Sequence, residues 1–135
     1  MAASLGERFA RALAAKDFDR LVSLLHPEVD FRGMTPGRFW EASNAVQAVD
    51  EIVRSWFEDS DQIDELLQVE TSRVADRERV GYRLAVSNPD GSFIVEQQAY
   101  YETSDGSITW MRVLCSGYRP ADAGAAGLRA APIGT

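Results

Sequence analysis

The chain has 135 residues, 45% of them hydrophobic, and a net charge of −7. This length suits one compact domain, and an acidic chain without a basic stripe is a poor nucleic-acid binder. Cys115 is the only cysteine and His26 the only histidine, which excludes an internal disulfide and argues against a zinc site.

The N-terminus lacks the features of a targeting segment. Glu7, Arg8 and Arg11 interrupt its apolar residues, which argues against a secretory signal, and no stretch is long and apolar enough to cross a bilayer. We therefore expect a cytoplasmic protein that binds no membrane and needs no cofactor.

The first half of the chain predicts helices. Apolar residues at helical spacing indicate one helix over residues 5–13 and a second that begins after Asp17, a good N-cap, and ends at Pro27. Asn44 and Gln47 have the spacing of a capping box and open a third helix.

Residues 29–31 predict a short strand, and residues 33–37 a flexible loop. Residues 66–74 predict a longer strand, and three more strands cover residues 80–118 with turns at 88–91 and 104–106.

Helices followed by strands indicate an α+β domain in which three helices cover one face of a curved antiparallel sheet. We expect it to span residues 1–119. Residues 120–135, rich in Ala, Gly and Pro, predict a mobile tail.

The strands over residues 80–118 predict polar groups on a buried face. If Asn88 pairs with Ser92 and Thr103 with Ile108, one face reads Tyr82, Leu84, Glu96, Gln98, Tyr100, Met111, Val113 and Cys115. Buried polar groups are costly unless they are paired or used, so this face predicts a pocket or a structural hydrogen-bond network. The alternative is a register shifted by one residue, which places Glu96 beside Arg83 or Arg112.

Glu96 is the acid–base candidate, because a carboxylate among apolar neighbours can exchange a proton with a substrate. Gln98, Tyr82 and Tyr100 could orient a carbonyl or hydroxyl group, or could form a satisfied network in the core. Trp40 and Trp56 could cover a flat ligand or belong to ordinary core.

The opposite face carries an apolar patch in the same register. We expect it to form a homodimer interface, with the residues Val95, Ala99, Tyr101, Trp110 and Leu114.

Two segments resemble a known family. Residues 9–33 combine an aromatic-bearing helix, an Asp-started helix and the extended sequence Pro-Glu-Val-Asp-Phe, and residues 96–113 look like a final hairpin. Together they resemble nuclear-transport-factor-2-like proteins, and most of all the SnoaL-like small-molecule enzymes. The resemblance implies a cone-shaped sheet that encloses one pocket with three helices, and commonly a homodimer through the outer sheet face.

The catalytic residues of that family do not carry over. The tyrosine, the base and the second acid of ketosteroid isomerases fall on Phe9, Gly33 and Gln98, of which only Gln98 can still donate a hydrogen bond to an oxyanion. The histidine pair of scytalone dehydratases is absent, because only His26 exists, and the Asp-Arg-Asp set of limonene-epoxide hydrolases is not evident.

Two functions remain open. The first is a SnoaL-like enzyme that isomerises, cyclises or dehydrates a small apolar molecule without a cofactor, with Glu96 and Gln98 as catalytic residues. The second is a non-catalytic ligand-binding or dimeric interaction module of the same fold. The residues expected to contact the small molecule are Phe9, Trp40, Trp56, Tyr82, Leu84, Tyr100, Met111, Val113 and Cys115.

Overall fold

The computed structural model describes residues 3–121 and confirms the α+β class. Beyond Ala121, the tail expected over residues 120–135 lies outside the described residues. None of the helices in the described part of the chain is long and apolar enough to cross a membrane.

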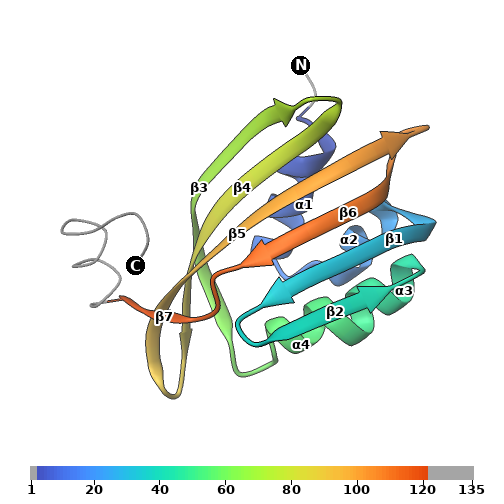
Figure 1. The fold of residues 1–135 in the computed structure, drawn as a ribbon. Helices are drawn as coiled ribbons and strands as arrows, with labels where there is room; N and C mark the ends of the chain where they lie inside the picture. The colour runs from blue at the N-terminus through green and yellow to red at the C-terminus, as the bar shows by residue number, and fades with distance from the viewer. Residues whose placement is uncertain (1–2, 122–135) are drawn as a thin grey trace.

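Three helical segments pack on one side of the sheet (Figure 1). Ser4 caps α1 (Leu5–Ala14), and the Asp17 side chain accepts from the Arg20 amide at the start of α2 (Phe18–Leu24), as its N-cap position predicts. Their apolar stripes are buried against the sheet, so these two helices cover part of its inner face.

The third segment begins at the predicted cap, because the Asn44 side chain accepts from the Gln47 amide. It is not one regular α-helix. A single π-helical stretch interrupts it, and such stretches are frequent at functional sites. The three pieces are α3 (Ala45–Gln47), η1 (Ala48–Val53) and α4 (Arg54–Trp56).

The sheet is open and has the strand order β2-β1-β6-β5-β4-β3. The strands are β1 (Leu25–Thr35), β2 (Arg38–Ala42), β3 (Gln62–Val74), β4 (Arg77–Asn88), β5 (Gly91–Ser104) and β6 (Ser107–Cys115), with the short β7 (Arg119–Pro120) beside β5.

Two expectations about this sheet are corrected. It is mixed rather than antiparallel throughout, because β1 and β6 pair in parallel. Residues 33–37 do not form a flexible loop: β1 continues to Thr35 and turns through Pro36 and Gly37 into β2. This hairpin lengthens the sheet at the edge nearest the third helical segment (Figure 1).

The register of β5 differs by one residue from the expected one. Asn88 pairs with Gly91, so the first turn holds two residues and not three, and Leu84 faces Val95. Thr103 pairs with Ile108 as expected, but Glu102 pairs with Trp110, which leaves Thr109 as an extra residue in a β-bulge. Because side chains alternate along a strand, both differences turn β5 over relative to its neighbours.

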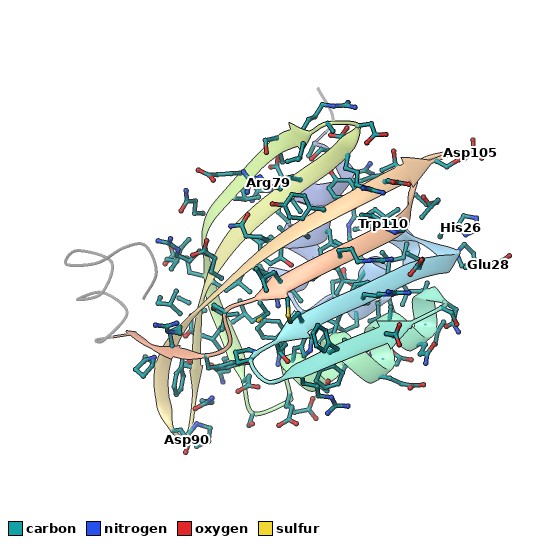
Figure 2. All side chains as sticks on the ribbon, viewed as in Figure 1. His26, Glu28, Arg79, Asp90, Asp105 and Trp110 are labelled. Atoms are coloured by element: carbon teal, nitrogen blue, oxygen red, sulfur yellow. The ribbon has the colours of Figure 1, made fainter. Side chains whose placement is uncertain are left out.

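The inner face, which we define as the side under the helices, therefore receives Val95, Gln97, Ala99 and Tyr101 from β5, and all four are buried. Glu96, Gln98 and Tyr100 point to the outer face. Figure 2 looks onto this outer face, where Arg79 and Trp110 are labelled.

Candidate functional site

A buried polar pair lies on the inner face, where β4 and β5 run side by side. Tyr82 faces Gln97, and its hydroxyl donates to Gln97 Oε1 over 2.5 Å. Only 2% of Tyr82 and 1% of Gln97 are exposed. Burial, and to a lesser degree the nearby Cys115, raises the pKa of Tyr82 above its usual range. The hydroxyl therefore stays protonated and remains a donor.

Three buried side-chain nitrogens of the described residues have no acceptor. They are Nε of Arg8 in α1, the amide nitrogen of Gln97 and Nε1 of Trp56. An unpaired buried donor costs roughly 1–3 kcal/mol, so native proteins seldom keep one without a reason. A bound molecule that places an oxygen beside such a donor would gain binding free energy from the new hydrogen bond.

Trp56 comes from α4, and its indole lies over Gly33 of β1. A Cβ atom at Gly33 would lie 2.7 Å from the Cη2 and Cζ2 atoms of the indole. On the neighbouring β6, Gly33 faces Val113, while Gln97 of β5 faces Cys115, two residues further along. The Gln97 and Trp56 donors therefore both lie on the inner face, over two strands that β6 separates.

The surroundings of these donors are apolar. Seven of the residues predicted to contact a small molecule are buried in the core: Phe9, Trp56, Tyr82, Leu84, Met111, Val113 and Cys115. Their contact with a ligand stays a prediction. Trp40 of β2 is only partly buried: its ring meets that of Trp56 edge-on at 6.2 Å between centroids, and Arg38 stacks on it at 3.6 Å.

The predicted placement of Glu96 and Gln98 inside the fold is wrong. Glu96 Oε1 accepts from Arg83 Nη2 over 3.1 Å, as the alternative register predicted, and Glu96 Oε2 accepts from Gln98 Nε2 over 3.0 Å. Gln98 Oε1 accepts in turn from Arg79. These groups satisfy one another on the outer face, and Tyr100 also lies there, beside Arg112.

The same shift corrects the predicted dimer patch. Val95, Ala99 and Tyr101 are buried on the inner face, whereas Leu114 is 52% exposed on the outer one. Gln97 is not among the predicted site residues. The signal that could have found it is Arg83, since placing Glu96 beside an arginine of β4 turns Gln97 inward.

In the described part of the chain, Asp61 and Gln97 are the two buried polar or charged residues. The two carboxylate oxygens of Asp61 accept from the Glu58 amide and from Asn88 Nδ2, each over 2.9 Å. The carboxylate thus fastens the connection between α4 and β3 to the end of β4. Tyr118 lies nearby and donates to the Trp56 carbonyl over 2.8 Å.

His26 follows α2 and lies within β1, where its Nδ1 accepts from the Glu28 amide over 3.0 Å. The ring therefore has a local structural contact near the end of the helix (Figure 2).

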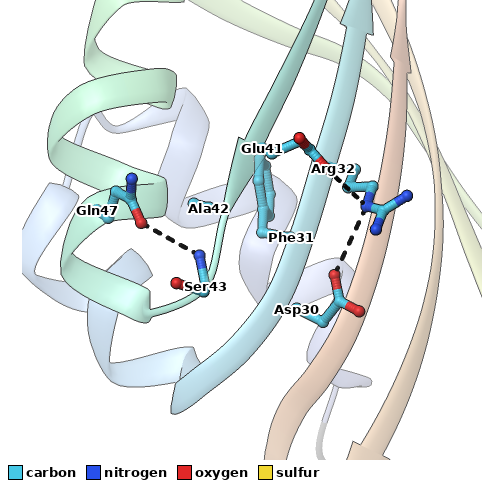
Figure 3. Close-up of a pocket in the computed structure, with 7 residues that line it drawn as sticks. All are labelled: Asp30, Phe31, Arg32, Glu41, Ala42, Ser43 and Gln47. Atoms are coloured by element: carbon cyan, nitrogen blue, oxygen red, sulfur yellow. Dashed lines mark hydrogen bonds and ion pairs between the residues drawn. The ribbon is translucent and has the colours of Figure 1, made fainter.

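Two hollows open on the surface of β1. One, of about 410 Å³, is shown in Figure 3, where Arg32 lies between Asp30 and Glu41 at 3.9 and 3.3 Å. The other, of about 340 Å³, is a groove on the outer face with Met34, Phe39 and Leu114 among its walls. Neither is lined by Gln97 or Trp56.

Solved structures share this arrangement of helices and sheet. A candidate isomerase from Bacillus subtilis superposes with a TM-score of 0.68 at 15% identity, over 82% of each chain. The fold is nuclear-transport-factor-2-like. A candidate isomerase from Rhodopseudomonas palustris has a TM-score of 0.67 at 20% identity, over 87% of this chain and 93% of that one. A protein from Catenulispora acidiphila with a ketosteroid-isomerase-like fold, in complex with trimethylamine, has a TM-score of 0.62 at 13% identity, over 86% and 88%.

No protein-family model matches the sequence. A 47-residue segment is 47% identical to part of the ECF RNA polymerase sigma factor SigJ of Mycobacterium tuberculosis. The segment covers 35% of this chain and only 15% of that protein. The comparisons therefore establish the nuclear-transport-factor-2-like fold.

Proposed function

We propose that this chain binds a small, mainly apolar molecule on the inner face of its sheet, without acid–base catalysis. The observation that carries the proposal is the Tyr82–Gln97 pair, which is buried among apolar side chains and leaves one amide nitrogen free. Binding sites for small molecules are commonly apolar, with a few well-placed polar groups.

The geometry favours binding over proton transfer. Glu96, the expected acid–base residue, is paired with Arg83 on the outer face. Asp61, the buried carboxylate of the described chain, has both oxygens engaged in holding a connection. Among residues 3–121, the inner face therefore offers donors that can orient a ligand but no free carboxylate that could move a proton.

A hydrocarbon of bicyclic size, 2-isopropylnaphthalene, tests this proposal. Titration should give saturable binding in two-dimensional ¹⁵N NMR spectra, with the largest shifts at inner-face residues. Ala99→Leu, which adds bulk to the inner face, should abolish binding. Ala85→Leu, on the outer side of β4, should not. Shifts confined to the outer face, or no binding, would refute an inner-face site.

We also propose that two copies associate through the outer face. Phe39 faces Met34 across β2 and β1, and Met34 faces Leu114 across β1 and β6, so these three side chains form one row. They are 78%, 41% and 52% exposed. A contiguous exposed apolar row of this kind is typical of an association surface.

A further inference from the structure

One connection runs beneath the sheet from one of its sides to the other. Residues 57–61 follow α4, whose Trp56 lies over β1 and meets Trp40 of β2, and they lead into β3. β2 and β3 are the two edges of the sheet, so this connection spans its width (Figure 1). Tyr82 and Gln97 on the inner face are buried. A molecule can therefore reach them only when an element of the fold moves.

Four side chains, which we call the latch, hold this connection in place: Lys16, Asp61, Asn88 and Tyr118. The Lys16 ammonium donates to the Glu58 carbonyl over 2.6 Å and also to the Asp61 carbonyl. The Asp61 carboxylate accepts from Asn88 at the end of β4, and Tyr118 donates to the Trp56 carbonyl. The latch thus ties α4 and its connection to the corner between α1 and α2, to β4 and to the segment after β6.

Lys16 occupies a backbone position that usually belongs to glycine. It follows the C-cap of α1 and has a φ of 53°. The amides of Lys16 and Asp17 donate to the Leu13 and Ala12 carbonyls over 2.9 Å. This is the Schellman arrangement of a helix end, in which glycine adopts the left-handed conformation without strain. A lysine there costs free energy that a glycine would not, and its ammonium, bonded to the connection, supplies the compensating contact.

Two features of the third helical segment favour its opening. The π-helical stretch η1 interrupts the regular hydrogen bonding directly before α4, and helices bend at such interruptions. Trp56 Nε1 is buried without an acceptor, and this cost disappears when the indole reaches water. The Asn44 cap holds the other end of the segment, so the bend is expected at η1.

We propose that α4 and its connection to β3 form a gate over the inner face, hinged at η1 and held shut by the latch. Lys16 sets how often the gate opens, because its ammonium bonds two carbonyls of the connection. Given the binding function proposed above, each opening admits or releases the ligand. The gate itself is a property of the free protein and can be measured without a ligand.

Native-state hydrogen exchange of the unmodified protein measures the gate directly. The backbone amides of residues 54–57 and the Trp56 indole N–H should exchange at least about 10-fold faster than the amides of Val80 and Val95, which need the sheet to unfold. Low concentrations of denaturant should hardly change the rates at the gate, because a local opening exposes little surface.

Lys16→Gly separates the latch from overall stability, because it removes the ammonium and also relieves the left-handed strain. Exchange at residues 54–57 should become about 10-fold faster, the effect of losing hydrogen bonds from a charged donor. The midpoint of denaturant unfolding should change little, since the two effects oppose each other.

The matched control is Ala75→Gly, which relieves the same kind of strain at the turn between β3 and β4, where φ is 57°. It should leave exchange at the gate unchanged. If Lys16→Gly does not fold, Lys16→Met takes its place, because it removes the ammonium and leaves the backbone preference nearly as it was.

Stopped-flow binding of 2-isopropylnaphthalene tests the link to function. The population of the open state limits entry, so Lys16→Gly should raise the association rate constant about 10-fold, and Ala75→Gly should not change it. An unchanged rate in Lys16→Gly would show that the ligand enters elsewhere and would overturn this route.

The outcomes separate the two proposals. Exchange at residues 54–57 as slow as that of Val80 in the unmodified protein would overturn the gate. So would unchanged exchange in Lys16→Gly, or an acceleration that the sheet shares equally. Localised opening in a protein that never binds the probe would overturn the binding function and leave the gate standing.

Discussion

At Gly33 the sheet has no side chain, and the indole of Trp56 occupies that place. A Cβ atom there would lie 2.7 Å from two carbons of the ring, closer than packed atoms approach. The two residues are therefore expected to be energetically coupled.

We expect Gly33→Ala to displace the indole, lower the free energy of unfolding by about 1–3 kcal/mol and shift the tryptophan fluorescence. Trp56→Phe removes the clashing atoms, so the double variant should lose less than the sum of the two single losses. Denaturant unfolding of the four proteins measures this. Additive losses would show that the two residues do not press on each other.

Two tyrosines predict how stability depends on pH. Burial raises the pKa of Tyr82 and of Tyr118 above the usual range, with Cys115 contributing at Tyr82 and Asp61 at Tyr118. An unfolded tyrosine loses its proton near pH 10, while the folded protein keeps it. The unfolded state therefore binds fewer protons than the folded state above about pH 10, and stability falls as the pH rises.

The melting temperature should thus decline above about pH 10, and Tyr82→Phe should decline less steeply because its phenyl ring has no proton to lose. Tyr100→Phe, on the outer face, is the matched control and should follow the unmodified protein. Identical slopes for all three proteins between pH 9 and pH 11 would contradict the assignment to Tyr82.

Between elements, one buried hydrogen bond joins α1 to the sheet. The Gly6 amide, in the first turn of the helix, donates to the Tyr101 hydroxyl of β5 over 2.9 Å. Helix N-termini leave such amides without intrahelical partners. The side chain of a distant strand therefore completes the hydrogen bonding of this helix.

Gly6→Ala should destabilise the protein even though alanine favours helices by up to about 1 kcal/mol over glycine. The new Cβ would lie 2.6 Å from the Tyr101 hydroxyl oxygen, and relief of such overlap costs about 1–3 kcal/mol. Adding Tyr101→Phe should recover part of the loss, because the closest atom is then gone. A gain in unfolding free energy with Gly6→Ala alone would show that the helix can move away from β5.

The elements differ in how far the sequence predicts them. Asp17 and Asn44 marked helix starts because capping is local chemistry within four residues. The inward residues of β4 and β6, such as Leu84 and Met111, were also predicted and are buried. The inward and outward faces of β5 were not predicted correctly. They depend on a two-residue turn at Pro89 and on an extra residue at Thr109. Neither feature changes the alternation of apolar and polar residues within β5, so that alternation does not reveal them.

That one difference changed the candidate site more than it changed the fold. Glu96 and Gln98 alternate with Gln97, so inverting β5 replaced a carboxylate by an amide on the inner face. The positions of the helices and the order of the strands do not depend on which face of β5 points inward, because the helices can pack on either face of that strand. The functional groups that a strand presents to a site can therefore be predicted only when the register of that strand is predicted correctly.

For the whole molecule, the outer apolar row predicts a dimer. Sedimentation at micromolar concentration should give about twice the chain mass of 14.9 kDa. Leu114→Glu should give a monomer, because it places a charge in the row formed by Met34 and Phe39. Salt should favour the dimer, since it screens the repulsion between two chains of charge −7.

The matched control is Leu67→Glu, which alters an exposed leucine of the edge strand β3 and should leave the dimer intact. A monomer at the same concentration in the unmodified protein would show that the outer row is not an association surface.

The parallel pairing of β1 with β6 also has a consequence for how the chain is made. Arg112 reaches back to the Asp30 carbonyl across 82 positions of sequence. A ribosome adds roughly 5–20 residues per second. The synthesis of Arg112 therefore follows that of Asp30 by about 4–16 s. Until β6 emerges, the hairpin of β1 and β2 has an unpaired edge, and no strand joins it to β3, β4 and β5. A nascent chain that stalls before residue 108 would therefore carry two half-sheets with unpaired edges, and we expect this form of the protein to be the most exposed to aggregation and the most dependent on chaperones.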